Sequence, residues 1–232
     1  MGLTNFLKSS LLSKFVMAVT GIILVAYIIG HTLGNLQFYL GPDVINAYAS
    51  FLRGTGELLW VVRFVLFAAV ILHIITSIRL SMLNQSSGGK YNVRQYVKTR
   101  IYSRTMLVTG ITIAAFVVYH ILHFTTGDID PSNHGLVDHY GPNNLFERHD
   151  LYYNMVMSFR QPLISAIYII GVLGVGFHLM HGSKSFFQTL GITGPKFTPA
   201  MDKISLAFGA IIALLLISIP VSVLLGLVGG EL

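Results

Sequence analysis

The sequence predicts an all-α integral membrane protein in which residues 1–232 form a single domain with five transmembrane helices. Of its 232 residues, 53% are hydrophobic and only 10% are charged, whereas about 25% are charged in typical soluble domains. The mean hydropathy is +0.70. Five apolar stretches are long enough to cross a bilayer, which takes about 20 residues. They cover residues 15–40, 58–83, 105–127, 161–185 and 204–228.

Residues 1–35 could also be read as a secretory signal peptide, because Lys8 and Lys14 precede an apolar run there. This apolar run is longer than a signal-peptide core, and no cleavage site of the small-x-small type follows it. We therefore expect a retained first helix. We find no convincing internal repeat.

The basic residues mark one side of the membrane. They gather before the first stretch, between the second and third, and between the fourth and fifth, where Asp202 is the one acidic residue among them. They are Lys8, Lys14, Arg79, Lys90, Arg94, Lys98, Arg100, Arg104, Lys184, Lys196 and Lys203. The positive-inside rule then predicts a cytoplasmic N-terminus and an external C-terminus. The net charge of +6 is thus a topology signal, and we expect no nucleic-acid partner.

The chain contains no cysteine. This excludes disulfides, thiolate-bound iron–sulfur clusters and covalent CxxCH haem attachment. Any redox centre that this chain holds must use other ligands.

The loop between the third and fourth stretches, residues 128–160, is predicted to be external. It is polar at first and then amphipathic in LFERHDLYYNMVMSF, which we expect to lie along the membrane surface. Its three histidines, His134, His139 and His149, are expected to be ordinary solvated residues.

Each of the first four stretches carries a histidine whose depth can be counted from flanking charges. His73 lies six residues before Arg79, and His178 lies six before Lys184, so both lie about 9 Å from the inner boundary at 1.5 Å per residue. His31 follows Lys14 by 17 residues, and His120 follows Arg104 by 16, which places both about 25 Å from that boundary. The four histidines therefore form two levels, two per level.

Two opposed imidazoles at one depth in an apolar helical bundle match the ligands of a six-coordinate b-type haem. We predict His73 with His178 as axial ligands of an inner haem, and His31 with His120 as axial ligands of an outer haem. A structural zinc site normally needs four ligands at one point, which this arrangement does not provide. Two alternatives stay open: each histidine could form a hydrogen bond across helices, or together they could relay protons in a transporter.

Further residues could support these sites. Arg79 and Lys184 follow the inner histidines at equivalent positions and could meet haem propionates, although interfacial snorkelling explains them equally. His123 and His181 each lie three residues beyond a proposed ligand. We interpret them as contacts around the haem, for propionates, waters or quinone. They could instead be ligands themselves, because residues i and i+3 share a helix face.

Glycines near the proposed ligands have two readings. Gly171, Gly174 and Gly176 precede His178 and could leave room for a flat macrocycle. Close helix packing through small residues is the alternative.

Four segments carry a resemblance to a known family: GHTLGNLQFY, AVILHIITSIRL, FVVYHILHF and GVLGVGFHLMHGSKSFFQTLGIT. With them the chain resembles, over nearly its whole length, the di-haem, five-helix cytochrome b membrane anchor of succinate dehydrogenase and fumarate reductase. In that family one histidine from each of the first four helices ligates haem, the first paired with the third and the second with the fourth. Matched by motif, these are His31 with His120 and His73 with His178.

The resemblance implies a subunit of a succinate:quinone oxidoreductase, respiratory complex II, in a bacterial cytoplasmic membrane. It implies two haems b, with menaquinone or another quinone as substrate. A flavoprotein that oxidises succinate and an iron–sulfur protein would bind the cytoplasmic face, and electrons would pass through the inner and then the outer haem to quinone. This chain would hold haem and quinone but not the succinate site. Contacts with membrane lipids and a higher homo-oligomer of the complex are also compatible with the family.

Some fumarate reductases of this type have a glutamate two residues before the fourth-helix ligand, where this chain has Gly176. A proton path through that position is therefore in doubt. Glu57 could exchange protons with quinone, and Trp60 and Arg63 could line a quinone cleft. An exposed helix-terminal carboxylate and an interfacial tryptophan explain the first two residues equally well.

Rival functions remain at this stage. A cytochrome b anchor of another quinone-linked dehydrogenase, of the hydrogenase or formate dehydrogenase type, would share both haem levels but take electrons from an external partner. The basic inner loops favour an inner partner. A transporter or proton channel would show no haem spectrum.

Overall fold

The fold is a bundle of five long helices, seen in a computed structural model that describes residues 9–86, 106–189, 191 and 194–230. Within these ranges the long helices are α2 (Ser10–Leu36), α4 (Glu57–Ser86), α6 (Met106–His120), α9 (Pro162–Thr189) and α10 (Phe197–Leu224). Each belongs to a segment long and apolar enough to cross a membrane. The predicted fold class is therefore confirmed. The basic residues Lys8, Lys90, Arg94, Lys98, Arg100 and Arg104 lie outside the described residues.

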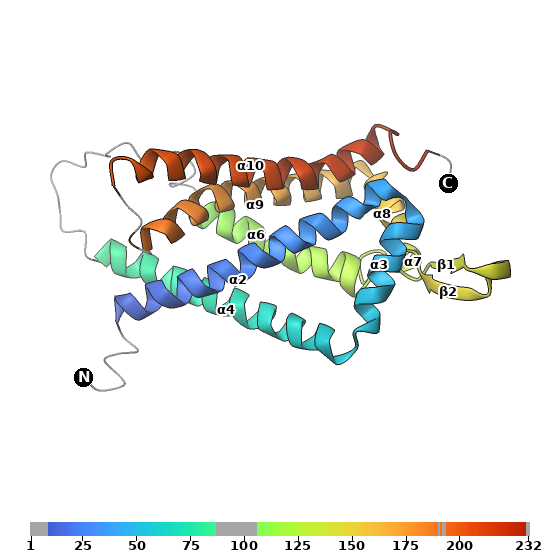
Figure 1. Cartoon of the computed structure of the whole chain (residues 1–232), viewed down its shortest axis with the longest axis horizontal. Helices are drawn as coiled ribbons and strands as arrows, with labels where there is room; N and C mark the ends of the chain where they lie inside the picture. The colour runs from blue at the N-terminus through green and yellow to red at the C-terminus, as the bar shows by residue number, and fades with distance from the viewer. Residues whose placement is uncertain (1–8, 87–105, 190, 192–193, 231–232) are drawn as a thin grey trace.

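Several helix ends differ from the sequence prediction. Helix α2 begins at Ser10 rather than at residue 15, because the Ser9 hydroxyl accepts a hydrogen bond from the Leu12 amide at 3.1 Å and so caps an earlier start. Helix α10 begins at Phe197 rather than at residue 204. Helix α10 ends at the opposite end of the bundle from the start of α2 (Figure 1), as an odd number of spans requires.

The long helices pack in a defined order around the bundle. Helix α2 packs against α4 and α9, and α6 packs against α9. The order around the bundle is therefore α4, α2, α9 and α6, which makes α2 and α6 one diagonal pair and α4 and α9 the other. Helix α10 packs against α9 and α2 and covers one side of the bundle (Figure 1).

Small residues bring α9 and α10 close together. A Cβ built at Gly176 would lie 3.1 Å from the Gly209 carbonyl oxygen, and one built at Gly209 would lie 2.5 Å from the Gly176 carbonyl oxygen. Close helix packing, the alternative reading of these glycines, is thus what the structure shows for Gly176. It also holds for Gly171, whose Cβ would overlap the Phe116 ring.

Shorter elements cover the end of the bundle where α2 ends and α4 begins (Figure 1). Helix α3 (Pro42–Gly54) follows a short 3-10 turn, Gln37–Leu40, and runs across this end. The loop after α6 forms the short helix α7 (Pro131–His134), an antiparallel hairpin of β1 (Val137–Tyr140) and β2 (Phe146–His149), and helix α8 (Leu151–Phe159). The hairpin pairs Val137 with His149 and Tyr140 with Phe146. We call these elements, α3, α7, β1, β2 and α8, the end cover.

Protein covers the apolar side of helix α8, which the sequence analysis expected to lie along the membrane surface. Its residues Met155, Val156 and Phe159 are at most 3% exposed and belong to one apolar core with Phe38 and Tyr168. The helix contacts α3, α9 and α10, so its apolar side chains are buried by protein rather than by lipid. The amphipathic pattern was correct, but a pattern alone does not say what covers the apolar face.

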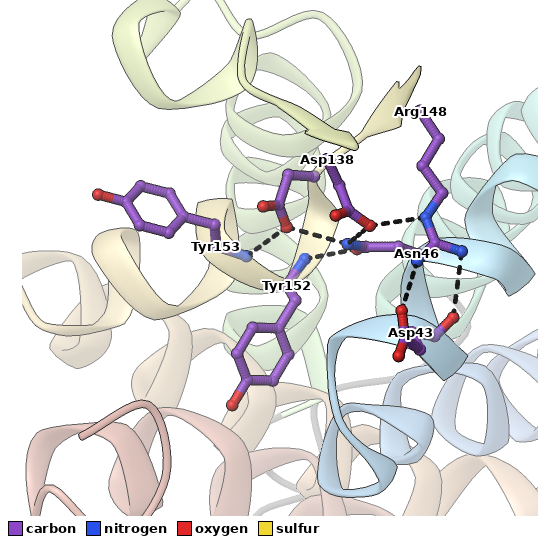
Figure 2. Close-up of polar contacts among 7 residues, drawn as sticks. Asp43, Asn46, Asp138, Arg148, Tyr152 and Tyr153 are labelled. Carbon is purple, nitrogen blue, oxygen red and sulfur yellow. Dashed lines mark hydrogen bonds and ion pairs between the residues drawn. The ribbon is translucent and has the colours of Figure 1, made fainter. Parts of the chain in front are cut away.

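A polar network centred on the buried Asn46 joins the parts of the end cover (Figure 2). The Asn46 amide donates to Asp138 at 3.1 Å and to Asp150 at 3.0 Å, and its oxygen accepts from the Tyr152 backbone N–H at 2.9 Å. Arg148 donates to Asp138 at 2.7 Å and to Asp43 at 3.0 Å. Asp150 also caps α8 by accepting from the Tyr153 N–H. One side chain of α3 therefore holds both the hairpin and the start of α8.

Candidate functional site

The four histidines singled out by depth face one another as two pairs inside the bundle. The rings of His31 and His120 have centroids 5.7 Å apart at an interplanar angle of 90°. The rings of His73 and His178 have centroids 6.4 Å apart at 63°. The two members of each pair come from diagonally opposed helices, α2 with α6 and α4 with α9, so each pair spans the interior of the bundle.

One ring nitrogen, Nδ1, of each of these histidines lies within hydrogen-bond distance of a hydroxyl. The four contacts are His31 with Tyr27 at 3.4 Å, His73 with Thr20 at 3.1 Å, His120 with Tyr168 at 3.3 Å, and His178 with Thr109 at 3.3 Å. A hydroxyl can accept a hydrogen bond from Nδ1–H, which fixes the ring tautomer and leaves Nε2 as the nitrogen that can bind a metal. The hydroxyl comes from another helix at His73, His120 and His178 and from the same helix at His31.

The threonine contacts measure the separation between the two levels. Thr20, beside His73, lies 11 residues before His31 on α2, and Thr109, beside His178, lies 11 residues before His120 on α6. At 1.5 Å per residue this is about 16 Å along each helix. The separation agrees with the roughly 15 Å counted from flanking charges.

The same contacts expose a repeated motif that the sequence analysis missed. Residues 20–31 read TGIILVAYIIGH and residues 109–120 read TGITIAAFVVYH. In each, the threonine contacts an inner histidine, and the glycine lies beside that ring, with built Cβ atoms at Gly21 and Gly110 3.6 and 3.8 Å from it. The final histidine is the outer one. Aligning the two segments on their histidines would have revealed the motif.

The spacing of the rings fits an iron bound between them. Metal–imidazole bonds are about 2.0 Å long, and a further 1.2 Å or so separates each nitrogen from its ring centre, which predicts centroids about 6.4 Å apart for linear coordination. The inner pair matches this value and the outer pair is slightly closer. The residues present therefore fit b-type haem.

His123 lies close to the outer pair but differs from the four histidines above. It is fully buried, with Nδ1 2.9 Å from the Tyr168 hydroxyl and Nε2 3.1 Å from the Ser158 hydroxyl. Both ring nitrogens are thus occupied by hydroxyls. The sequence argument that His120 and His123 share a face assumed an α-helix, whereas Ile121–Thr125 forms a π-helical turn. Both imidazoles nevertheless contact the same Tyr168 hydroxyl, so His123 lies beside the outer pair.

The residues near the inner pair have partners of their own. Lys184 forms an ion pair with Asp202, their atoms Nζ and Oδ1 lying 2.5 Å apart. The Nε2 atom of His181 lies 3.0 Å from the Ser185 hydroxyl. Arg79 also has an interaction partner within the protein.

The three residues suggested for quinone lie at the start of α4. Glu57 is in its first turn, and the Arg63 guanidinium lies 5.0 Å above the Trp60 ring. Trp60 is 68% exposed, as expected for an interfacial tryptophan. A groove of ≈230 Å³ lies elsewhere, between α9 and α10, and its lining, which includes Leu173 and Leu214, is apolar. None of the three residues suggested for quinone lines this groove.

Two loop histidines are less exposed than the sequence suggested. The rings of His134 and His149 lie 5.0 Å apart. Within the described ranges, neither His134 Nδ1 nor His149 Nε2, both buried, has a hydrogen-bond partner. Burial, the Arg53 charge and His134 together lower the pKa of His149 to about 4. The expectation that these histidines are solvated is wrong for this pair, because the hairpin folds back onto α7; His139 is exposed, as expected.

Comparison with known proteins gives one informative relative. Over 179 residues, the chain is 25% identical to the succinate dehydrogenase cytochrome b558 subunit of Bacillus subtilis (strain 168), covering 77% of each chain. Neither a family model nor a solved structure matches.

Proposed function

We propose that this chain is the cytochrome b membrane anchor of a succinate:quinone oxidoreductase and binds two b-type haems. The observation that carries the proposal is the geometry of the four imidazoles. They form two facing pairs, His31 with His120 and His73 with His178, from diagonal helices at two levels, and each Nδ1 meets a hydroxyl. The name of the Bacillus subtilis relative supports the same assignment.

Each part of the chain has a defined task in this proposal. A bound haem b supplies reversible one-electron transfer. The Nε2 atoms of each histidine pair would hold one haem, and the hydroxyls of Tyr27, Thr20, Tyr168 and Thr109 keep the other ring nitrogen of each histidine protonated. The apolar helices exclude water from both sites.

Basic residues beside the inner pair would receive the haem propionates. Arg79, Lys184 and His181 are the proposed contacts. Lys184 would share its charge between a propionate and Asp202, with which it is paired. The ammonium group carries three donors, so both interactions can form at once.

In this proposal the N-terminus and the basic loops are cytoplasmic, and the flavoprotein and iron–sulfur subunits bind there. Quinone, menaquinone or a relative, reacts at the opposite end near Glu57, Trp60 and Arg63. Glu57 exchanges protons with the quinone, and Arg63 and Trp60 contact its head group. The complex belongs to the bacterial cytoplasmic membrane.

The test is the haem content of the purified chain with its bound partners. We expect a dithionite-reduced b-type spectrum and, by the pyridine haemochrome method, two haems per chain. His31→Ala and His120→Ala should each abolish the same haem, and His73→Ala and His178→Ala the other. A wild-type content of one haem or none contradicts the proposal, as do variants of one pair that lose different haems. Copurification with a hydrogenase or formate dehydrogenase subunit would instead identify the rival anchor.

A further inference from the structure

Tyr168 and His123 form a polar group beside the outer histidine pair. Tyr168 is 6% exposed and His123 is fully buried. The Tyr168 hydroxyl lies 3.3 Å from Nδ1 of His120 and 2.9 Å from Nδ1 of His123. One hydroxyl is therefore shared by two imidazoles, one at the proposed haem site and one outside it.

The polar contacts continue from His123 into the end cover. His123 Nε2 lies 3.1 Å from the Ser158 hydroxyl, which in turn donates to the Asn154 side-chain oxygen at 3.2 Å. Ser158 is fully buried and Asn154 is 1% exposed. Four successive contacts thus join His120 on α6 to helix α8. We call His120, Tyr168, His123, Ser158 and Asn154 the outer chain.

With the Asn154 side-chain oxygen accepting from Ser158, the hydrogen bonds of the outer chain run in one direction. The Asn154 oxygen can only accept, so the Ser158 proton points to it, and Ser158 must accept from His123 Nε2–H. A neutral His123 then has an unprotonated Nδ1, which accepts from the Tyr168 hydroxyl. The Tyr168 oxygen is left to accept from Nδ1–H of His120. Nε2 of His120 is consequently unprotonated and can bind a metal.

We propose that Tyr168 and His123 are positioning residues that fix the protonation of His120 and lower the reduction potential of the outer haem. The inference rests on the proposed function, since it assumes that His120 binds haem. A hydrogen-bond acceptor on Nδ1–H makes an imidazole a stronger ligand, which stabilises the oxidised iron. Successive hydrogen bonds polarise one another, so an intact outer chain strengthens this effect beyond that of one hydroxyl.

The experiment is a redox titration, followed by visible absorbance, of the purified holoprotein with its partner subunits. Tyr168→Phe removes the acceptor and keeps the ring. We expect it to raise the midpoint potential of one haem and to leave the other unchanged. Thr20→Val, which removes the hydroxyl beside His73, should shift the other haem. Tyr119→Phe is the matched control: the Tyr119 ring contacts His123, but its hydroxyl forms no hydrogen bond within the described part of the chain.

A pair of variants at His123 keeps the proposal testable even if Tyr168→Phe fails to assemble. His123→Leu removes the acceptor for the Tyr168 proton and should shift the same haem in the same direction, by less. His123→Gln should restore the wild-type potential, because its amide can accept from Tyr168 and donate to Ser158. The low-spin electron paramagnetic resonance signal of that haem should follow the same pattern.

Each other outcome overturns the inference. A wild-type potential in both His123→Leu and Tyr168→Phe would show that the outer chain does not act on the haem. Equal shifts of both haems, or no difference between His123→Leu and His123→Gln, would show a structural effect only. Failure of the proposed function is separate, because it appears as a wild-type protein without two haems.

Discussion

Replacing Asn46 by alanine should open the end cover, and the size of the effect follows from the contacts of this residue. Asn46 is fully buried and makes three hydrogen bonds, two to the carboxylates of Asp138 and Asp150 and one from the Tyr152 N–H. Hydrogen bonds to charged groups contribute about 1.5–3 kcal/mol each and neutral ones about 1 kcal/mol. The carboxylates keep other partners, Arg148 and the Tyr153 N–H, so we expect the lower end of the sum, about 3–4 kcal/mol.

The assay is hydrogen exchange, measured by mass spectrometry, over residues 137–159 of the purified protein. In the regime where exchange reports the open population, 3–4 kcal/mol corresponds to exchange faster by about 10²–10³-fold. Asp43→Ala is the matched control. Asp43 is 92% exposed and its partner Arg148 keeps Asp138, so we expect a change of less than about fivefold.

Two results would refute this reasoning. Exchange in Asn46→Ala that is less than tenfold faster than in the wild type would mean that Asn46 does not join the hairpin to α8. An equal effect of Asp43→Ala would mean that the ion pair on the surface, rather than the buried amide, holds the cover in place.

Three further predictions concern other parts of the molecule. Gly209→Ala should lower the free energy of unfolding, followed by thermal unfolding, by about 1–3 kcal/mol, because the new Cβ would meet a backbone oxygen of α9 and the backbone must move. Gly182→Ala is the control, since its Cβ meets no atom within 4 Å. Equal stability of the two variants would contradict the prediction. The protection of residues 137–159 against exchange, corrected for the intrinsic exchange rate at each pH, should fall as the pH falls from about 6.5 to about 4, because the open state protonates His149 near 6.5 and the closed state only near 4. The closed end cover should lose roughly 1–2 kcal/mol of stability over this pH range, after allowance for solvent screening of the half-buried His149 ring. His149→Gln should make the protection independent of pH in this range. An unchanged pH dependence in that variant would exclude His149 as the cause. Gly21→Leu should reduce the haem content from two to one per chain, because the leucine side chain would fill the space beside His73. Gly21→Ala should retain both haems. Two haems in Gly21→Leu would mean that the inner haem lies elsewhere.

The sequence by itself determined the features that depend on position along a helix. Apolar length predicted the five long helices, and counting 1.5 Å per residue from Arg79 and Lys184 sorted the histidines into two levels. The depth count grouped His31 with His120 and His73 with His178, and these rings do lie together. Their role as haem ligands remains a prediction.

Only the tertiary structure decided what surrounds each ring. The sequence analysis treated Thr20, Thr109 and Tyr168 as ordinary residues of apolar helices, because nothing in one helix says that its hydroxyl meets a histidine on another; the repeat that contains Thr20 and Thr109 acquired this meaning only from the structure. It also assumed a regular α-helix from His120 to His123, whereas Ile121–Thr125 forms a π-helical turn. Depth accumulates residue by residue along one helix, but rotation about the helix axis and contacts between helices depend on how all of them pack, and that information belongs to no single segment.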